Sequence, residues 1–365
     1  MKVLSGLIIG AIFGFMLHRG GLVRYSRIIG ALLLRDFKAM NFMFTGLAVA
    51  ALLYGISDLI NLGTVPRING YFGMGHIVGG ILFGIGMAVA GLCPGTCAAR
   101  FSSGKLLVGV GVLGVFVGVF MYELFFSTVS AIGGMPRFIT LSMVFDIPYG
   151  YLAITFGLLF IGMSFFLSKI DPSKKFDNIQ EEKNLLQREW GWFSTGAVAG
   201  VLIFISTAIG EYLSFAGGFL AMGAHISSLF GYPFESVPTL NESTLWRAML
   251  SLGVFPGAFL SSYLAKTISQ EKVTPLFQEA FSSNMAVRGL TIFASGVLMT
   301  FGALIGGGCT TGAFMSGWPT LSIGSLVMGG TFFAVAMITA NLMFVGRYRL
   351  VGEVKERFKL NLAND

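Results

Sequence analysis

The chain has 365 residues, of which 55% are hydrophobic and 11% are charged. Because a soluble globular protein carries about 25% charged residues, this composition excludes that class and predicts an integral membrane protein in contact with lipid. The net charge of +7 also suits nucleic acid, but the cations lie in short segments between apolar runs, so no nucleic-acid partner is expected.

Apolar runs of about 20 residues recur along the chain and are continuous rather than alternating, which predicts an all-α membrane protein and not a β-barrel. No small-residue cleavage site precedes His18-Arg19, so the first run is interpreted as a retained helix rather than a signal peptide. About nine transmembrane helices are expected, at about 3–17, 38–58, 72–92, 106–128, 149–168, 192–213, 246–264, 288–308 and 321–345.

The segments between these spans differ in composition. A charged stretch at 169–190 is predicted to be a linker, and 346–365 a charged tail. Non-helical backbone at membrane depth is tolerated only where protein buries it or where it lines a cavity. Four further connectors, too apolar or too glycine-rich to be ordinary loops, are therefore expected to be re-entrant loops that meet near the midplane: 20–36, 93–104, 214–232 and 309–320.

The Lys and Arg residues divide unevenly between the two faces that the spans define. Lys2, Arg67, Arg137 and Arg247 fall on the face of the N-terminus, and the other 20 of the 24 fall on the opposite face. By the positive-inside rule the linker, the tail and the C-terminus are cytoplasmic, and the N-terminus lies outside.

The chain contains an internal repeat. A shift of 216 positions, without a gap, pairs Gly91 with Gly307 and Cys93 with Cys309. The order of spans and connectors also repeats, in halves of about 1–128 and 192–345.

One span separates the two halves, so the second half enters from the other face. This is an inverted repeat within a single transmembrane transporter domain, residues 1–365, with the site predicted where the halves meet.

All three cysteines lie in two matched segments, the first cysteine turn (91–97, GLCPGTC) and the second cysteine turn (307–312, GGCTTG). Residues suited to begin a short helix follow Cys93 and Cys309, and a helix N-terminus favours an anion. A thiol is soft and polarizable, so it suits a sulfur atom better than a hard oxyanion. The candidate pathway residues are Cys93, Cys97, Cys309, Thr96, Thr310, Thr311, Gly95, Gly308 and His225, the last because it lies inside an apolar connector.

The segments GGILFGIGMAVAGLCPGTCA and GVLMTFGALIGGGCTTGAFMSG resemble the two signature regions of the YeeE/YedE family, which contains thiosulfate transporters of bacterial inner membranes. The resemblance covers essentially the whole chain. It implies that an anionic sulfur compound passes along a row of cysteines through transient S–H···S contacts, with Cys93 and Cys309 as relay positions. It also implies a cytoplasmic sulfurtransferase as a partner.

The chain departs from the family pattern in its first re-entrant segment. The family's thiosulfate carriers tend to have a further cysteine there, whereas residues 18–25 (HRGGLVRY) contain none. Cys97, one helical turn after Cys93, either replaces that thiol or serves another purpose, and the substrate is thiosulfate or a different sulfur species.

Several alternatives remain open from the residues alone. Cys93 and Cys97 could form a metal or dithiol redox pair, and Cys97 could be a small core residue. The protein could carry a selenium species or a soft metal ion, be a membrane redox enzyme, or be a structural subunit. No G-x-x-x-x-G-K-[ST] motif, paired haem histidines or flavin motif is present, so neither enzymatic activity nor a cofactor is expected.

Four other polar residues have two interpretations each. His76 either lines the entrance or packs with satisfied hydrogen bonds, and Glu211 is either functional or interfacial. Arg100 and Lys105 either attract an anion at the exit or anchor the chain at the membrane surface.

Overall fold

The computed structural model describes residues 2–64, 66–133, 136–171, 187–268 and 273–345. Eight segments in this part of the chain are helical, long and apolar enough to cross a membrane, which confirms the predicted all-α membrane protein. They are built on α1 (Lys2–Arg19), α3 (Lys38–Leu59), α4 (Met74–Ala90), α6 (Gly109–Leu124), α9 (Tyr149–Ile170), α13 (Glu242–Ala265), α15 (Met285–Ile305) and α16 (Ile323–Val345).

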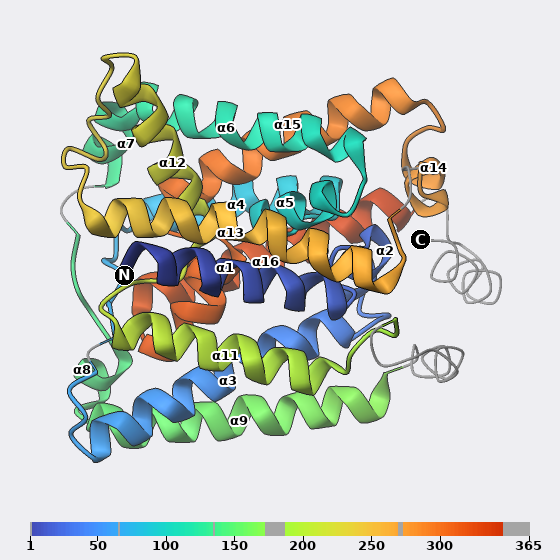
Figure 1. The fold of residues 1–365 in the computed structure, drawn as a ribbon. Helices are drawn as coiled ribbons and strands as arrows, with labels where there is room; N and C mark the ends of the chain where they lie inside the picture. The colour runs from blue at the N-terminus through green and yellow to red at the C-terminus, as the bar shows by residue number, and fades with distance from the viewer. Residues whose placement is uncertain (1, 65, 134–135, 172–186, 269–272, 346–365) are drawn as a thin grey trace.

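The remaining predicted span, 192–213, is represented by α11 (Trp192–Ala208), which is apolar but has only 17 residues. At 1.5 Å per residue it is about 26 Å long, which is at the short limit for crossing a bilayer core. It ends early because Gly210 adopts a left-handed conformation with a φ of 79°. Figure 1 shows α11 running alongside α1 and α3.

Each predicted re-entrant connector contains a short helix. These are α2 (Tyr25–Leu32), α5 (Pro94–Ser102), α12 (Phe215–Leu229) and η3 (Thr310–Ser316), a seven-residue π-helix. Their residues are mostly buried among the long helices. The ends of the bundle carry α7 (Phe126–Gly133), α8 (Leu141–Phe145), α14 (Pro275–Ala280) and two single 3₁₀ turns, η1 (Leu106–Val108) and η4 (Trp318–Thr320).

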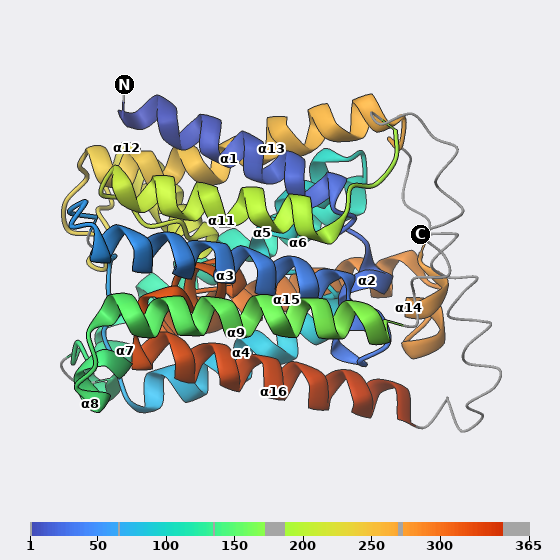
Figure 2. The ribbon, with the colours of Figure 1, turned by 90° about the horizontal axis from the view of Figure 1, so that it is seen from below.

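The long helices pack in pairs (Figures 1 and 2). α1 lies along α13, α3 lies between α9 and α11, and α4 lies between α15 and α16. The contacts are close because glycines face backbone: a Cβ on Gly257 would lie 1.9 Å from the carbonyl oxygen of Ala11. Small residues at such interfaces are how membrane helices gain packing without a hydrophobic driving force.

The crossing of α4 and α15 is reciprocal. A Cβ on Gly86 would lie 2.9 Å from the amide nitrogen of Met299, and one on Gly302 would lie 2.6 Å from that of Phe83. The shift of 216 residues converts the first contact into the second. The order of the long helices in the two halves likewise relates the pair α1–α13 to α11–α3, and the pair α4–α16 to α15–α6. These matched contacts support the predicted inverted repeat.

The two ends of the bundle differ. We call the end where α1 finishes and α3 begins the basic end, and the other the opposite end. α1 begins at the opposite end and α16 finishes at the basic end (Figure 2). The predicted tail, 346–365, lies outside the described residues, as does most of the predicted linker. The last two residues of that linker are held against the bundle, because Glu189 pairs with Arg24 and the backbone N–H of Trp190 donates to the carbonyl of Arg19 at the end of α1.

Candidate functional site

The two cysteine turns have the same backbone conformation. Gly91 and Gly307 have φ angles of 62° and 79°, in the left-handed region that favours glycine. Two residues later, Cys93 and Cys309 are extended, and each is the residue that caps the following short helix. The sequence therefore places a thiol at the N-terminus of α5 and another at the N-terminus of η3, as predicted.

Hydrogen bonds fix the position of the Cys93 side chain. The amide of Cys93 donates to the hydroxyl oxygen of Thr96 at 2.7 Å, and that hydroxyl lies 3.3 Å from the Cys93 sulfur. Pro94 occupies the first helical position, where its lack of an N–H costs nothing. The side chain of Thr96 thus caps the backbone and contacts the thiol at once.

Residues outside the second turn hold that turn in place. Nδ1 of His76 lies 2.8 Å from the carbonyl oxygen of Gly306, and Nε2 of His76 accepts a hydrogen bond of 3.0 Å from the backbone amide of Phe72. His76 is therefore a satisfied packing histidine rather than an entrance residue. The hydroxyl of Tyr212 donates to the carbonyl of Gly312. Both supports are polar side chains that hold a backbone carbonyl.

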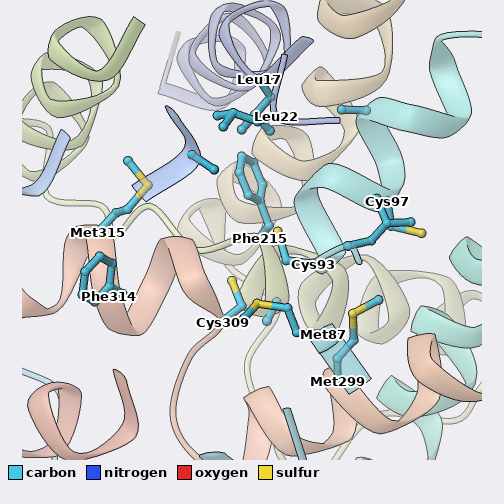
Figure 3. Packing of buried hydrophobic residues seen from close by; sticks show 14 of the residues in the cluster. Leu17, Leu22, Met87, Cys93, Cys97, Phe215, Met299, Cys309, Phe314 and Met315 are labelled. Atoms are coloured by element: carbon cyan, nitrogen blue, oxygen red, sulfur yellow. The ribbon is translucent and has the colours of Figure 1, made fainter. Parts of the chain in front are cut away.

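Cys93, Thr96, Thr310 and Thr311 line one cavity of about 50 Å³, so the structure brings residues of both turns together. Figure 3 shows the side chains of Cys309 and Cys93 grouped with Met87. The rest of the wall is apolar but rich in sulfur. Six sulfur-bearing side chains line it: Met40, Met43, Met87, Cys93, Met315 and Met337. We call this space the apolar cavity.

A second cavity, of about 190 Å³, lies towards the opposite end, and we call it the polar cavity. Arg67 and Arg247 supply its cations, while Asn69 and Tyr212 supply neutral polar groups; the Asn69 amide donates to the Tyr212 hydroxyl at 2.9 Å. Glu211, which is buried, lies 3.8 Å from Arg247 and 2.7 Å from the Lys2 ammonium. This carboxylate fixes two cations beside the cavity.

Cys309 lies between these two cavities. The residues before it, Gly307 and Gly308, line the polar cavity, and the residues after it, Thr310 and Thr311, line the apolar cavity. Its own side chain is fully buried. The Cys309 turn therefore contributes to the walls of both cavities.

A third cavity, of about 290 Å³, lies at the basic end, and we call it the basic basin. Segment 21–23 separates it from the apolar cavity, because Gly21 and Val23 line the basin whereas Leu22 lines the apolar cavity. Arg100 of α5 fixes this segment by donating from Nη1 to the carbonyl of Val23 at 3.0 Å.

Three predicted pathway residues lie elsewhere. The sulfur of Cys97 faces Val108 and Gly111, on the side of α5 away from Cys93 (Figure 3). His225 lies 3.3 Å from the hydroxyl of Thr244 and lines none of the three cavities above. Gly95 allows the ring of Phe215 to pack on α5.

Cys97 faces away from the cavity because the side of α5 that carries it packs against α6 at Gly111. Cys93 lies outside α5, as the extended residue that caps it, so the two thiols do not share a helix face. Among the described residues, no group of three or more His, Cys, Asp and Glu side chains could hold a metal ion.

The sequence analysis missed several cavity residues. Met87 contacts the Thr310 hydroxyl at 3.8 Å, but one methionine in an apolar helix gives no signal by itself. Tyr212 and Asn69 lie in connectors without a recognisable motif. A signal did exist for Arg67 and Arg247, which are two of the four cations assigned to the N-terminal face.

Comparison with known proteins identifies the family. The family model described as sulphur transport matches residues 19–338. The chain belongs to the sulphur transport family. The predicted resemblance is thereby confirmed, and the apolar helices and the family together make this a multi-pass membrane protein of sulfur-compound transport.

Two curated members of this family are similar along most of their length. The thiosulfate transporter TsuA of Escherichia coli is 27% identical over 343 residues, covering 85% of this chain and 86% of the relative. TsuA of Spirochaeta thermophila is 25% identical over 342 residues, covering 88% of this chain and 93% of the relative.

Proposed function

We propose that this protein takes up a small inorganic sulfur anion, thiosulfate first, along a path from the polar cavity past Cys309 and Cys93 to the basic basin. The observation that carries the proposal is the position of Cys309 between two cavities. Both relatives described above are named thiosulfate transporters. The single transporter domain is then one path shared by two inverted halves.

The polar cavity contains the groups that attract the anion and bind it as it enters. Arg67 and Arg247 attract an anion, and the amide of Asn69 and the hydroxyl of Tyr212 provide hydrogen-bonding groups for an anion that loses part of its hydration shell. The excess of Lys and Arg at the other end supports, through the positive-inside rule, an orientation with the polar cavity outside and the basic basin in the cytoplasm of a bacterial inner membrane.

The apolar cavity supplies the selectivity. Its thiols and thioethers are soft, polarizable groups, which match the terminal sulfur of thiosulfate better than the oxygens of sulfate. The hydroxyls of Thr96, Thr310 and Thr311 provide donors for the oxygens. A thiol that donates a weak S–H hydrogen bond at each step lets the anion move on without a covalent bond, so no catalysis is required. A cytoplasmic sulfurtransferase would consume the anion.

Growth and uptake measurements test this proposal. A bacterium unable to use sulfate but expressing this protein should grow with thiosulfate as the sole sulfur source, and proteoliposomes should accumulate labelled thiosulfate. Cys93→Ala and Cys309→Ala should each lower uptake at least tenfold. Normal uptake by both variants would refute the thiol pathway.

The six sulfur-bearing side chains of the apolar cavity also favour a second candidate function, the transport of a selenium species or a soft metal ion. Competition separates the candidates. Unlabelled thiosulfate should suppress uptake of the labelled anion in the same proteoliposomes, whereas excess selenite should not. Silver uptake that proceeds without any sulfur anion would favour the second candidate.

A further inference from the structure

The carboxylate of Glu189 occupies part of the basic basin. Its oxygens lie 2.9 Å from Arg24 Nη2, 2.6 Å from Lys38 Nζ and 3.4 Å from Arg27 Nη2. The side chain is only 13% exposed. Burial raises the pKa of the Glu189 carboxyl group, but Arg24, Lys38 and Arg27 together lower it below its ordinary range, so the group is ionised at neutral pH.

A second acid, Asp36, holds the Arg27 guanidinium and the backbone of Lys38 independently of Glu189. Asp36 is fully buried, and its carboxylate lies 2.7 Å from Arg27 Nη1 and accepts a hydrogen bond of 3.0 Å from the backbone amide of Lys38. The cations are therefore positioned by the beginning of α3 and by α2. Removal of the Glu189 charge alone would leave the cationic site built.

Glu189 also contacts the segment that separates the basin from the apolar cavity. A Cβ on Gly21 would lie 2.8 Å from a carboxylate oxygen of Glu189. The next residue, Trp190, donates its backbone N–H to the carbonyl of Arg19 at 2.9 Å. Its ring lies 5.7 Å from that of Phe15. Residues 189–190 thus hold the end of α1 and segment 21–23 in their present position.

The rest of the basin is strongly cationic. Among the described residues, its lining contains one carboxylate, that of Glu189, and six Lys or Arg side chains: Arg19, Arg24, Arg100, Lys105, Arg188 and Lys266. The volume of about 290 Å³ is sufficient for a small oxyanion with water. A carboxylate and an inorganic oxyanion accept the same charge-assisted hydrogen bonds from guanidinium and ammonium groups.

We propose that the basic basin is a binding site for a small dianionic oxyanion of the thiosulfate and sulfate class, and that the carboxylate of Glu189 is its built-in competitor. An arriving anion displaces Glu189 from Arg24, the one of its three cationic partners that lines the basin, and segment 21–23 loses a contact that holds it. Permeation requires that the anion bind weakly enough to be released. A competitor attached to the protein weakens the apparent affinity for the anion, because the anion can bind only during the fraction of time that the site is free. This inference rests on the proposed function for the direction of flow but not for binding.

Calorimetric titration of the purified full-length protein with sodium sulfate and with sodium thiosulfate, at constant ionic strength, tests the site. Glu189→Gln should bind each anion at least tenfold more tightly than the wild type, which corresponds to a competitor present for about nine-tenths of the time. Glu242→Gln makes the same chemical change at an exposed glutamate at the start of α13, at the opposite end, and should bind like the wild type. Arg24→Gln should weaken binding.

Thermal unfolding gives a second readout if Glu189→Gln folds poorly. Sulfate should raise its unfolding midpoint more than that of Glu242→Gln, because the anion replaces the missing carboxylate. The shorter carboxylate of Glu189→Asp should give an intermediate affinity. Equal anion affinity and equal sulfate stabilisation in Glu189→Gln and Glu242→Gln would overturn the proposal.

The Cys309→Ala variant separates this inference from the proposed function. The basin does not include Cys309, so anion binding there should persist when uptake is lost. Unchanged thiosulfate uptake in that variant, with tighter binding in Glu189→Gln, would remove the thiol pathway and leave the basin site standing.

Discussion

The first cysteine turn continues into an α-helix that begins with Pro94, whereas the second continues into a π-helix that begins with Thr310. Their backbones match up to the cysteine, with a left-handed glycine two residues before it in each. The side chains then diverge. Thr96 caps the first turn from within, while the Tyr212 hydroxyl holds the second turn from another part of the chain.

The difference shows how two matched backbone turns can have different side-chain surroundings. Leu92 of the first turn corresponds to Gly308 of the second, and only Gly308 lines the polar cavity. Arg100 corresponds to Ser316, and each donates to a backbone carbonyl just before a short helix. Arg100 donates to the carbonyl of Val23, before α2, and Ser316 donates to that of Leu213, before α12. Only the arginine adds charge to the cavity beside it. Similar backbones thus carry an uncharged side chain, Ser316, in the second half where the first half has a cationic one, Arg100.

The largest effect on uptake is expected when Gly308 of the second turn is replaced by leucine, the residue at the corresponding position, 92, of the first turn. A Cβ on Gly308 would lie 2.6 Å from the amide nitrogen of Ala313, so Gly308→Leu should displace the start of η3. We expect uptake to be abolished and the free energy of unfolding to fall by about 1–3 kcal/mol.

Uptake in proteoliposomes and the unfolding midpoint measure both consequences. Gly330→Leu is the matched control, because a Cβ there would meet nothing within 4 Å. If Gly308→Leu transports as well as Gly330→Leu, the glycine does not set the shape of the second turn.

The next effect concerns Cys97, which has no corresponding cysteine in the second turn. Cys97 corresponds to Ala313, and its sulfur faces α6 rather than the apolar cavity. Cys97→Ala should therefore change the thiosulfate uptake rate less than twofold, against the tenfold loss expected for Cys309→Ala. An uptake loss in Cys97→Ala as large as that in Cys93→Ala would place Cys97 in the pathway.

A smaller effect is expected from the internal cap of the first turn. Thr96→Val removes the hydroxyl that accepts from the Cys93 amide, and the loss of such a cap costs about 1 kcal/mol of stability. The unfolding midpoint should fall by a few degrees, and Thr96→Ser, which keeps the hydroxyl, should restore most of it. A midpoint for Thr96→Val equal to that of the wild type would show that the cap contributes nothing.

The smallest effect concerns pH: between pH 5 and 8, the contribution of Glu189 to stability should not change. The cations around Glu189 lower its pKa below the usual range, which is about 4.3 for a free glutamate. The stabilisation by the ionised form is then fully present above pH 4.3 and is lost only as the pH falls through the lower value of the folded protein. Between pH 5 and 8 the difference in unfolding midpoint between wild type and Glu189→Gln should stay constant. A change of that difference with a midpoint near pH 6 would contradict this assignment.

The amino-acid sequence by itself determined the class of the protein and the position of most elements. Continuous apolar runs have the length of a bilayer, and Gly91 and Gly307 interrupt them where the chain must turn. Both signals are local, so they can be recognised without neighbours. For the same reason the two matched turns and their threonines could be identified as candidates, and Cys93, Thr96, Thr310 and Thr311 do line one cavity.

Only the tertiary structure decided which side chains meet. Cys97 turns away from the cavity because α5 packs that face on α6, and Glu189 returns to the bundle because Arg24, Arg27 and Lys38 surround it. A polar linker composition cannot reveal that one of its carboxylates is buried. The direction of a side chain depends on helices that are distant in the sequence. The apolar residues on the surfaces of those helices do not specify which residues will face each other, so side-chain directions cannot be predicted from the sequence.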